Sequence, residues 1–133
     1  MPARRYYLDA SALVKLVISE VESEALRRHI AGNALLVSSR IAAVEVRRVA
    51  ARQTERDATH QVDQLLESVA HVELDEQLAT IAGAAKPETL RSLDAIHLAS
   101  ALSVRDELDA VISYDLRLAD AARAAGLTVV APA

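Results

Sequence analysis

Short apolar runs alternate along the chain with longer segments in which apolar residues recur every three or four positions. The short runs predict strands and the longer segments predict helices. Strands are predicted at 5–8 (RYYL), 34–37 (ALLV), 71–74 (HVEL, the weakest pattern), 109–113 (DAVIS) and 127–130 (LTVV). This alternation is typical of βαβ units, so the predicted fold class is α/β, with a mainly parallel central sheet of about five strands flanked by helices.

Capping residues mark the predicted helix starts. Asp9 stands where the first strand turns into a helix, and Ser19 followed by Glu22 has the pattern of a capping box. Asp75 is the expected cap of the helix after the third strand, and Pro87 marks the entrance to the next one. The helices after the first are predicted at 19–30, 38–53, 58–70, 76–85, 90–108 and 116–126.

The length of 133 residues suits one domain covering 1–133, which can bury roughly two thirds of its unfolded surface. The chain has no cysteine, which fits a reducing compartment. It has no apolar run of membrane-spanning length, and its first residues lack the apolar core of a signal peptide. We therefore expect a soluble cytoplasmic protein without membrane association.

Charge and aromatic content limit the ways in which the chain could bind nucleic acid. The formal net charge of −4 argues against a broad nucleic-acid grip, and the absence of Phe and Trp argues against base stacking. Residues 40–56 are locally basic, with Arg48, Arg52 and Arg56 on one helical stripe. That stripe is either a solvated face or a surface that contacts phosphate.

Two aspartates occupy equivalent places in the predicted pattern. Asp9 and Asp115 each follow an apolar strand and precede a helix. Alone, each is most simply an N-cap. Two such residues in one parallel sheet lie at the same edge, where open α/β sheets bind their ligands.

Two further acids interrupt apolar helical faces. Asp94 falls in the first turn of its helix if Ser92 caps it, and Glu45 is either a surface partner of Arg48 or directed into a site. Together with Asp9 and Asp115 they make an oxygen-rich acidic set that suits hard cations such as Mg²⁺ or Mn²⁺. His97, three residues after Asp94, is most simply a core residue. The alternatives are that it binds a metal ion or that it pairs with a carboxylate and serves as a general base.

Several motifs together resemble one known family. The segments YLDASALVKL, VEVRR, LRSLDAIHLASAL and VISYDLRLADAARAAGLTVVAP are similar, in this order and spacing, to the PIN-domain ribonucleases, and above all to the VapC toxins of VapBC-type toxin–antitoxin pairs. The resemblance assigns the family's four catalytic, metal-binding acids to Asp9, Glu45, Asp94 and Asp115. It also matches the family's small hydroxyl residues to Ser11 and Ser113, which would support the carboxylates or contact phosphate.

The resemblance implies endonucleolytic cleavage of RNA with Mg²⁺ or Mn²⁺ in an acidic pocket. Glu45 would bind metal or orient the attacking water, and Arg91, Arg48 and Arg52 are speculative phosphate contacts. It further implies a homodimer and a cognate VapB-like antitoxin that inserts a basic segment over the carboxylates. Asp120 lies in the last motif, but we do not assign it to the metal.

Two other classes compete with the nuclease. A receiver-like signalling domain shares the fold and binds Mg²⁺, but it usually has an acidic pair after the first strand, where Ala10 and Ser11 follow Asp9 here. A non-catalytic RNA-binding module on the same fold is the other alternative, because fold alone does not fix function.

Overall fold

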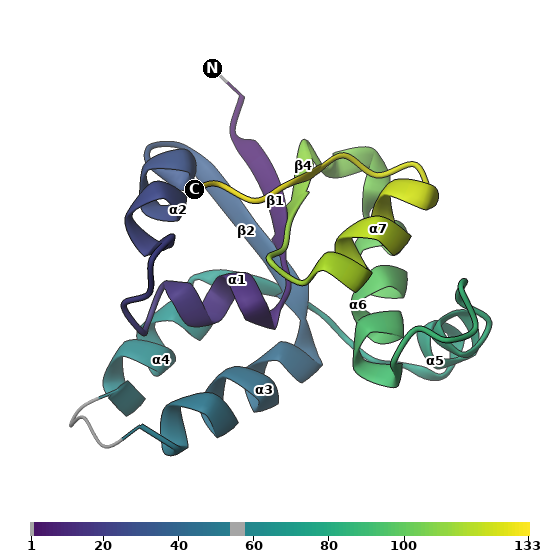
Figure 1. Cartoon of the computed structure of the whole chain (residues 1–133), viewed down its shortest axis with the longest axis horizontal. Helices are drawn as coiled ribbons and strands as arrows, with labels where there is room; N and C mark the ends of the chain where they lie inside the picture. Colours follow the sequence, from purple (N-terminus) through teal and green to yellow (C-terminus); the bar gives the residue numbers. More distant parts are fainter. Residues whose placement is uncertain (1, 54–57) are drawn as a thin grey trace.

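A five-stranded parallel sheet forms the centre of the molecule (Figure 1). The computed structural model describes residues 2–53 and 58–133. The strands are β1 (Arg4–Leu8), β2 (Ala34–Ser39), β3 (Val69–Val72), β4 (Ala110–Ile112) and β5 (Val129–Val130). They lie in the order β3-β2-β1-β4-β5, with all four pairings parallel. The chain winds from β1 outward to β3 and then returns to the other side of β1, so the switch point lies between β1 and β4. The predicted α/β fold is confirmed.

Helices cover both faces of the sheet (Figure 1). They are α1 (Ala10–Lys15), α2 (Ser23–Ile30), α3 (Arg40–Ala51), α4 (Ala58–Glu67), α5 (Glu76–Gly83), α6 (Ser92–Ser103) and α7 (Leu116–Ala124), with a short 3₁₀ turn at Arg105–Glu107. None of the described helices is long and apolar enough to cross a membrane.

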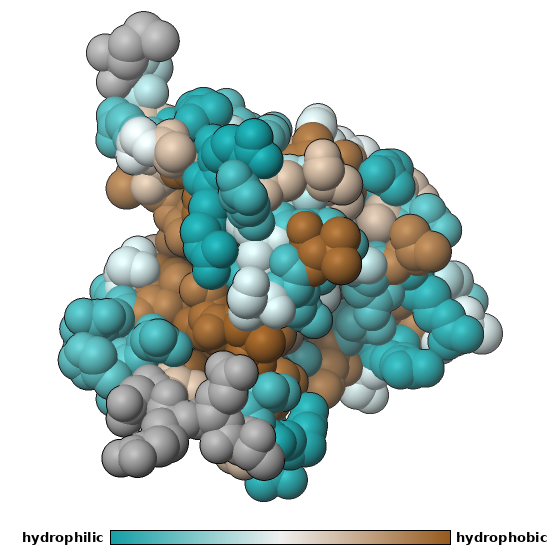
Figure 2. All heavy atoms as spheres, turned by 60° about the vertical axis from the view of Figure 1, so that its left-hand side comes forward, coloured by the Kyte–Doolittle hydropathy of each residue, from teal (hydrophilic) through white to brown (hydrophobic). Residues whose placement is uncertain are grey.

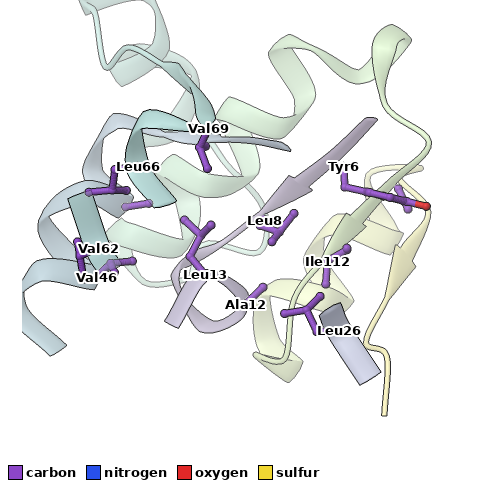
Figure 3. Packing of buried hydrophobic residues seen from close by; sticks show 12 residues of the cluster. Tyr6, Leu8, Ala12, Leu13, Leu26, Val46, Val62, Leu66, Val69 and Ile112 are labelled. Atoms are coloured by element: carbon purple, nitrogen blue, oxygen red, sulfur yellow. The ribbon is translucent and has the colours of Figure 1, made fainter. Parts of the chain in front are cut away.

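The alternation of β1 divides the hydrophobic core into two layers. Tyr6 and Leu8 point to one face, where they pack with side chains of α1 to α4 (Figure 3). Tyr7 points to the opposite face, against α6 and α7. Successive residues of a strand face opposite sides, so the three buried residues at the end of β1 serve both layers.

Side-chain caps begin four of the helices. Asp9 caps α1, Ser39 caps α3, Asp75 caps α5 and Asp115 caps α7, each by accepting a backbone N–H. All four caps stand at the end of a strand or after its short exit loop. The predicted caps at Asp9, Asp75 and Asp115 are confirmed.

The predicted capping box at Ser19 is wrong. Helix α2 begins at Ser23, and Glu22 stands at its N-cap position without a side-chain cap bond. The carboxylates of Glu22 and Glu20 instead bind the ammonium group of Lys15, at 2.8 and 3.3 Å. A largely buried cation must be paired, and this requirement prevails over the local capping pattern.

Other boundaries also differ from the sequence pattern. The third strand is Val69–Val72 rather than 71–74, and α4 ends at Glu67 rather than at 70. This edge strand takes its register from pairing with β2, in which Val69 lies opposite Leu36.

Helix α3 ends at Ala51, two residues before the predicted end, and Arg56 of the predicted stripe lies outside the described residues. Helix α6 starts at Ser92, well after Pro87, and stops at Ser103.

Replacement of Leu13 by alanine should destabilise the fold strongly. Leu13 is 0% exposed in the layer under α1 to α4, so its loss leaves a cavity and should lower the free energy of unfolding by about 2–5 kcal/mol. Urea unfolding measures this change. Val21→Ala, at a side chain that is 96% exposed, is the control and should shift stability by less than about 0.5 kcal/mol. A loss at Leu13 no larger than that of the control would contradict the core assignment.

Candidate active site

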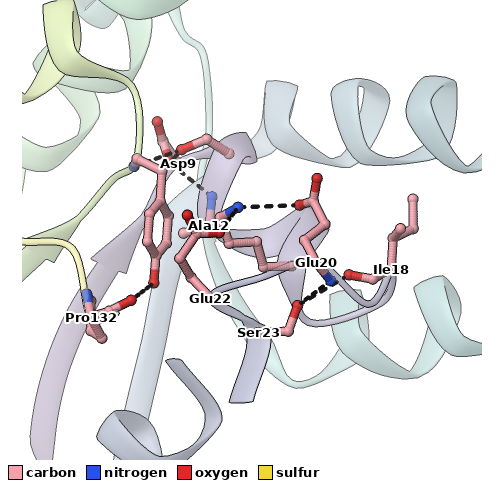
Figure 4. A network of polar contacts seen from close by, with 10 residues as sticks. Asp9, Ala12, Ile18, Glu20, Glu22, Ser23 and Pro132 are labelled. Atoms are coloured by element: carbon pink, nitrogen blue, oxygen red, sulfur yellow. Dashed lines mark hydrogen bonds and ion pairs between the residues drawn. The ribbon is translucent and has the colours of Figure 1, made fainter. Parts of the chain in front are cut away.

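Asp9 lies at the centre of the polar cluster at the carboxyl end of β1 (Figure 4). It is only 3% exposed, and both of its carboxylate oxygens accept hydrogen bonds. Oδ1 accepts from the hydroxyl of Ser11 at 2.6 Å and from the backbone N–H of Ala12 at 3.1 Å. Oδ2 accepts from the hydroxyl of Ser113 at 2.7 Å. Burial raises the pKa of Asp9, and these hydrogen bonds oppose the rise because they stabilise the ionised form.

The two serines connect Asp9 to the loop that follows β4. Ser113 Oγ accepts the backbone N–H of Asp115 at 3.1 Å, and Ser11 Oγ accepts that of Tyr114 at 2.9 Å. Each hydroxyl therefore donates to Asp9 and accepts from the β4 loop. The ends of β1 and β4, which are adjacent strands at the switch point, are held together through one carboxylate.

Asp115 caps α7 from the same loop. Its Oδ1 accepts the backbone N–H groups of Arg117 and Leu118, at 2.9 and 3.1 Å. The structure thus gives Asp115 the simple capping role and also places its charge where it acts on Asp94. The two interpretations of a strand-end aspartate do not exclude each other.

Asp94 lies in the first turn of α6 and faces the other acids. Partial burial raises its pKa, and the negative charges of Asp115, Asp9 and Glu45 raise it further, while His97 acts in the opposite direction. The charges of the other three acids assigned from the sequence therefore all reach Asp94. Like charges held together in this way are stabilised by a bound cation.

Glu45 enters the cluster from α3 and is held by a histidine. Its Oε1 lies 2.7 Å from Nε2 of His97, a side chain that is 2% exposed. Nδ1 of His97 lies 2.7 Å from the hydroxyl of buried Tyr7. Of the two alternatives for Glu45, a surface pair with Arg48 or a side chain directed into a site, the structure shows the second. The sequence did not reveal the role of Tyr7, because it reads as an ordinary core residue of β1.

The buried side chain of Lys15 contacts the loop that follows β4. Nζ of Lys15 lies 4.6 Å from the ring centroid of Tyr114, whose hydroxyl donates to the backbone oxygen of Pro132 at 2.6 Å. Burial opposes the charge of Lys15, but hydrogen bonds to Glu22 and Glu20 outweigh it and raise its pKa. No local sequence pattern predicts this contact.

The donors of the cluster suit a hard divalent cation. They are carboxylate oxygens, the ligands that Mg²⁺ and Mn²⁺ prefer, and their mutual repulsion is the condition that such a cation relieves. Across residues 2–53 and 58–133, no three acidic or histidine side chains lie close enough to form a finished metal site. The acids therefore fit the cation by the chemistry of their oxygen donors.

The remaining candidates lie at the surface. Arg91 is exposed at the N-cap position of α6, three residues before Asp94. Arg48 and Arg52 are exposed near the end of α3, the helix that carries Glu45. Asp120 points to solvent, with a side chain 82% exposed and 3.8 Å from Arg123, so it does not join the acidic cluster.

The fold and the cluster define a class of protein: an α/β domain with an acidic site at the switch point of a parallel sheet. The PIN domain family model matches residues 6–124, and the chain belongs to this family. The membership predicted from the sequence motifs is confirmed. The comparisons do not favour a receiver-like domain or a non-catalytic module.

Curated and structural relatives point in the same direction. The chain is 40% identical over 132 residues to "Ribonuclease VapC46" of Mycobacterium tuberculosis, a match covering 95% of this chain and 96% of the relative. The fold matches that of VapC20 of M. tuberculosis, described as a sarcin-ricin loop cleaving toxin, with TM-score 0.71, 16% identity and coverage of 96% and 99% of the two chains. It also matches a chain of VapBC2 of Rickettsia felis bound to a promoter DNA fragment, with TM-score 0.70, 12% identity and coverage of 97% and 99%.

Replacement of Asp9 by asparagine should stabilise the metal-free protein at neutral pH. Burial raises the pKa of Asp9 in the folded state, so wild-type stability falls as pH rises from the unfolded pKa of about 3.9 through the folded pKa. Asparagine still caps a helix and does not ionise, so the variant lacks this fall. Urea unfolding in EDTA at several pH values should show the advantage of Asp9→Asn growing with pH.

Asp120→Asn, which removes an exposed charge outside the cluster, corrects for the change in net charge. A difference between Asp9→Asn and wild type that stays constant from acid to neutral pH would show that burial of the ionised carboxylate carries no penalty.

Proposed function

We propose that this chain is a metal-dependent endoribonuclease of the VapC kind, the toxin of a toxin–antitoxin pair. The observation that carries the proposal is that Ser113 joins Asp9 to the loop of Asp115 at the ends of β1 and β4, while burial and the charges of Asp115, Asp9 and Glu45 raise the pKa of Asp94. Family membership and the VapC relatives support the same activity. A cytoplasmic location is part of the proposal, because that is where a cellular toxin meets its RNA.

PIN-domain VapC ribonucleases are generally metal-dependent, and we propose Mg²⁺ or Mn²⁺ for this chain. Asp9, Asp94, Asp115 and Glu45 would hold the ion. When bound, such an ion supplies activation of water and stabilisation of the leaving oxygen of a phosphodiester. Ser11 and Ser113 fix the orientation of the Asp9 carboxyl group through hydrogen bonds of 2.6 and 2.7 Å.

The chain's own residues would divide the remaining work. Glu45 keeps Oε1 on His97, which leaves Oε2 to orient the attacking water or to bind the ion. Arg91 beside Asp94, and Arg48 and Arg52 on α3, would contact substrate phosphates. With few aromatic residues for stacking, the substrate class that fits best is a structured RNA recognised by shape and backbone.

We further propose two protein partners, a cognate VapB-like antitoxin and a second copy of the chain. An antitoxin segment carrying arginine would silence the site by pairing with the carboxylates. Figure 2 shows hydrophobic surface on the side of the molecule formed by α1 to α4. Val21 and Val44, 96% and 62% exposed, belong to these segments, and exposed apolar side chains of this kind support a protein interface.

RNA cleavage tests the nuclease directly. The purified protein should cut total RNA at specific sites with Mg²⁺ or Mn²⁺ and should stop in EDTA. Asp9→Asn should cut no faster than the EDTA control, because a central carboxylate of the cluster has lost its charge. Asp120→Asn, the same chemical change outside the cluster, should cut like wild type. Cutting by wild type and Asp9→Asn at equal rates would overturn the assignment of Asp9.

Metal binding gives a second test that needs no RNA. Mn²⁺ at a hundred times its dissociation constant should raise the free energy of unfolding of the wild type by about 2.7 kcal/mol, since the ion binds the folded state alone. Asp94→Asn should lose most of this gain, and Asp120→Asn should keep it. Equal stabilisation of wild type and Asp94→Asn would place the metal elsewhere.

A further inference from the structure

A buried line of side chains runs from the core to the acidic cluster. It begins at Tyr7 on β1, passes through His97 on α6 and ends at Glu45 on α3. Both contacts are 2.7 Å long. Tyr7 is 1% exposed and His97 2%, whereas the side chain of Glu45 is 23% exposed and reaches the site. The line therefore has a fixed inner end and an outer end at the site.

Each hydrogen bond along this line has a defined donor and a defined acceptor. Burial raises the pKa of Tyr7 far above its usual range, so the phenol keeps its proton. Ser38 and Ser100, which lie beside the phenol, donate their own protons to the backbone oxygens of Leu8 and Ile96. The carboxylate oxygen of Glu45 accepts, so the contact at Nε2 requires a proton on that nitrogen. With a single ring proton on Nε2, Nδ1 accepts the hydrogen bond of the Tyr7 hydroxyl.

Glu45 needs such support because its neighbours repel it. Its negative charge acts on Asp94, whose pKa it helps to raise. A glutamate side chain has several rotatable bonds, and repulsion from other carboxylates favours rotamers that point away from them. The imidazole of His97 is fixed by its contact with the Tyr7 hydroxyl and by edge-to-face packing against the same ring, with the ring centroids 5.8 Å apart. Its Nε2–H, directed at Glu45, opposes that movement.

We propose that Tyr7 and His97 are positioning residues for Glu45: the phenol fixes the imidazole, and the imidazole holds Oε1 so that Oε2 faces the other acids. Resting on the nuclease function proposed above, this assigns a role to two core residues that touch neither substrate nor metal. Groups that orient a metal ligand typically contribute about 10–100-fold in affinity or activity.

Removal of one hydroxyl tests the inner end of the line. Tyr7→Phe should lower the cleavage rate about tenfold, with the loss in kcat rather than in KM, because RNA binding does not involve the phenol. Tyr6→Phe is the matched control: Tyr6 is also buried, but its ring contacts His29 on the opposite side of the sheet. His97→Gln, which can still donate to Glu45, should retain more activity than His97→Leu. Equal losses for Tyr7→Phe and Tyr6→Phe would overturn the proposal.

A double-mutant cycle shows whether the effect passes through Glu45. Glu45→Gln should reduce cleavage, and adding Tyr7→Phe to it should cause no further loss, since there is no carboxylate left to hold in place. Losses that multiply would mean that Tyr7 supports the fold in general and would overturn the proposal. Glu45→Gln cutting like wild type would instead refute the role of Glu45 in the nuclease.

Nitrogen NMR of the metal-free protein tests the contacts between Tyr7, His97 and Glu45 without an activity assay. With ¹⁵N-labelled histidine, the signals lost in His97→Gln identify the ring of His97. In wild type they should show a single tautomer with the proton on Nε2, and in Tyr7→Phe this preference should weaken. A proton on Nδ1 in wild type, or unchanged signals in Tyr7→Phe, would overturn the proposal even if the nuclease activity is established.

Discussion

A carboxylate buried at the end of a central strand must have hydrogen-bond partners, and the requirements of Asp9 organise the rest of the site. Its partners come from both sides of the switch point: Ser11 and Ala12 from the start of α1, and Ser113 from the loop after β4. Because the two serines also accept the backbone N–H groups of that loop, one side chain fixes the geometry of two strand ends. Loss of these bonds would leave a buried charge without compensation.

The same constraint links stability to function. Burial raises the pKa values of Asp9 and Asp94, and neighbouring negative charges raise that of Asp94 further, so the ionised cluster works against the folded state. An ordinary core would gain nothing from such an arrangement. The arrangement is explained by a ligand whose binding offsets the repulsion between the carboxylates. A hard cation does this and also supplies the chemistry of phosphodiester hydrolysis. The site is thus a place where the fold gives up stability for binding.

The accuracy of the sequence predictions depended on how local each signal was. Asp9 and Asp115 were recognisable because a strand, a cap and a helix follow one another within a few residues. The third strand was misplaced because an edge strand takes its register from its neighbour, as Val69 does from Leu36. The capping box at Ser19 failed because Lys15 needed the carboxylate of Glu22.

The sequence by itself determined the fold class and the family, since the alternation of strands and helices and the ordered motifs are properties of neighbouring residues, and it predicted the four acids. Tertiary structure alone decided what holds these acids. Glu45 and His97 are 52 residues apart, and His97 and Tyr7 are 90 apart, so no local pattern pairs them. Only the packing of α3 and α6 at the sheet brings a buried imidazole between a phenol and a carboxylate, because the low dielectric of the core requires each polar group there to find a partner.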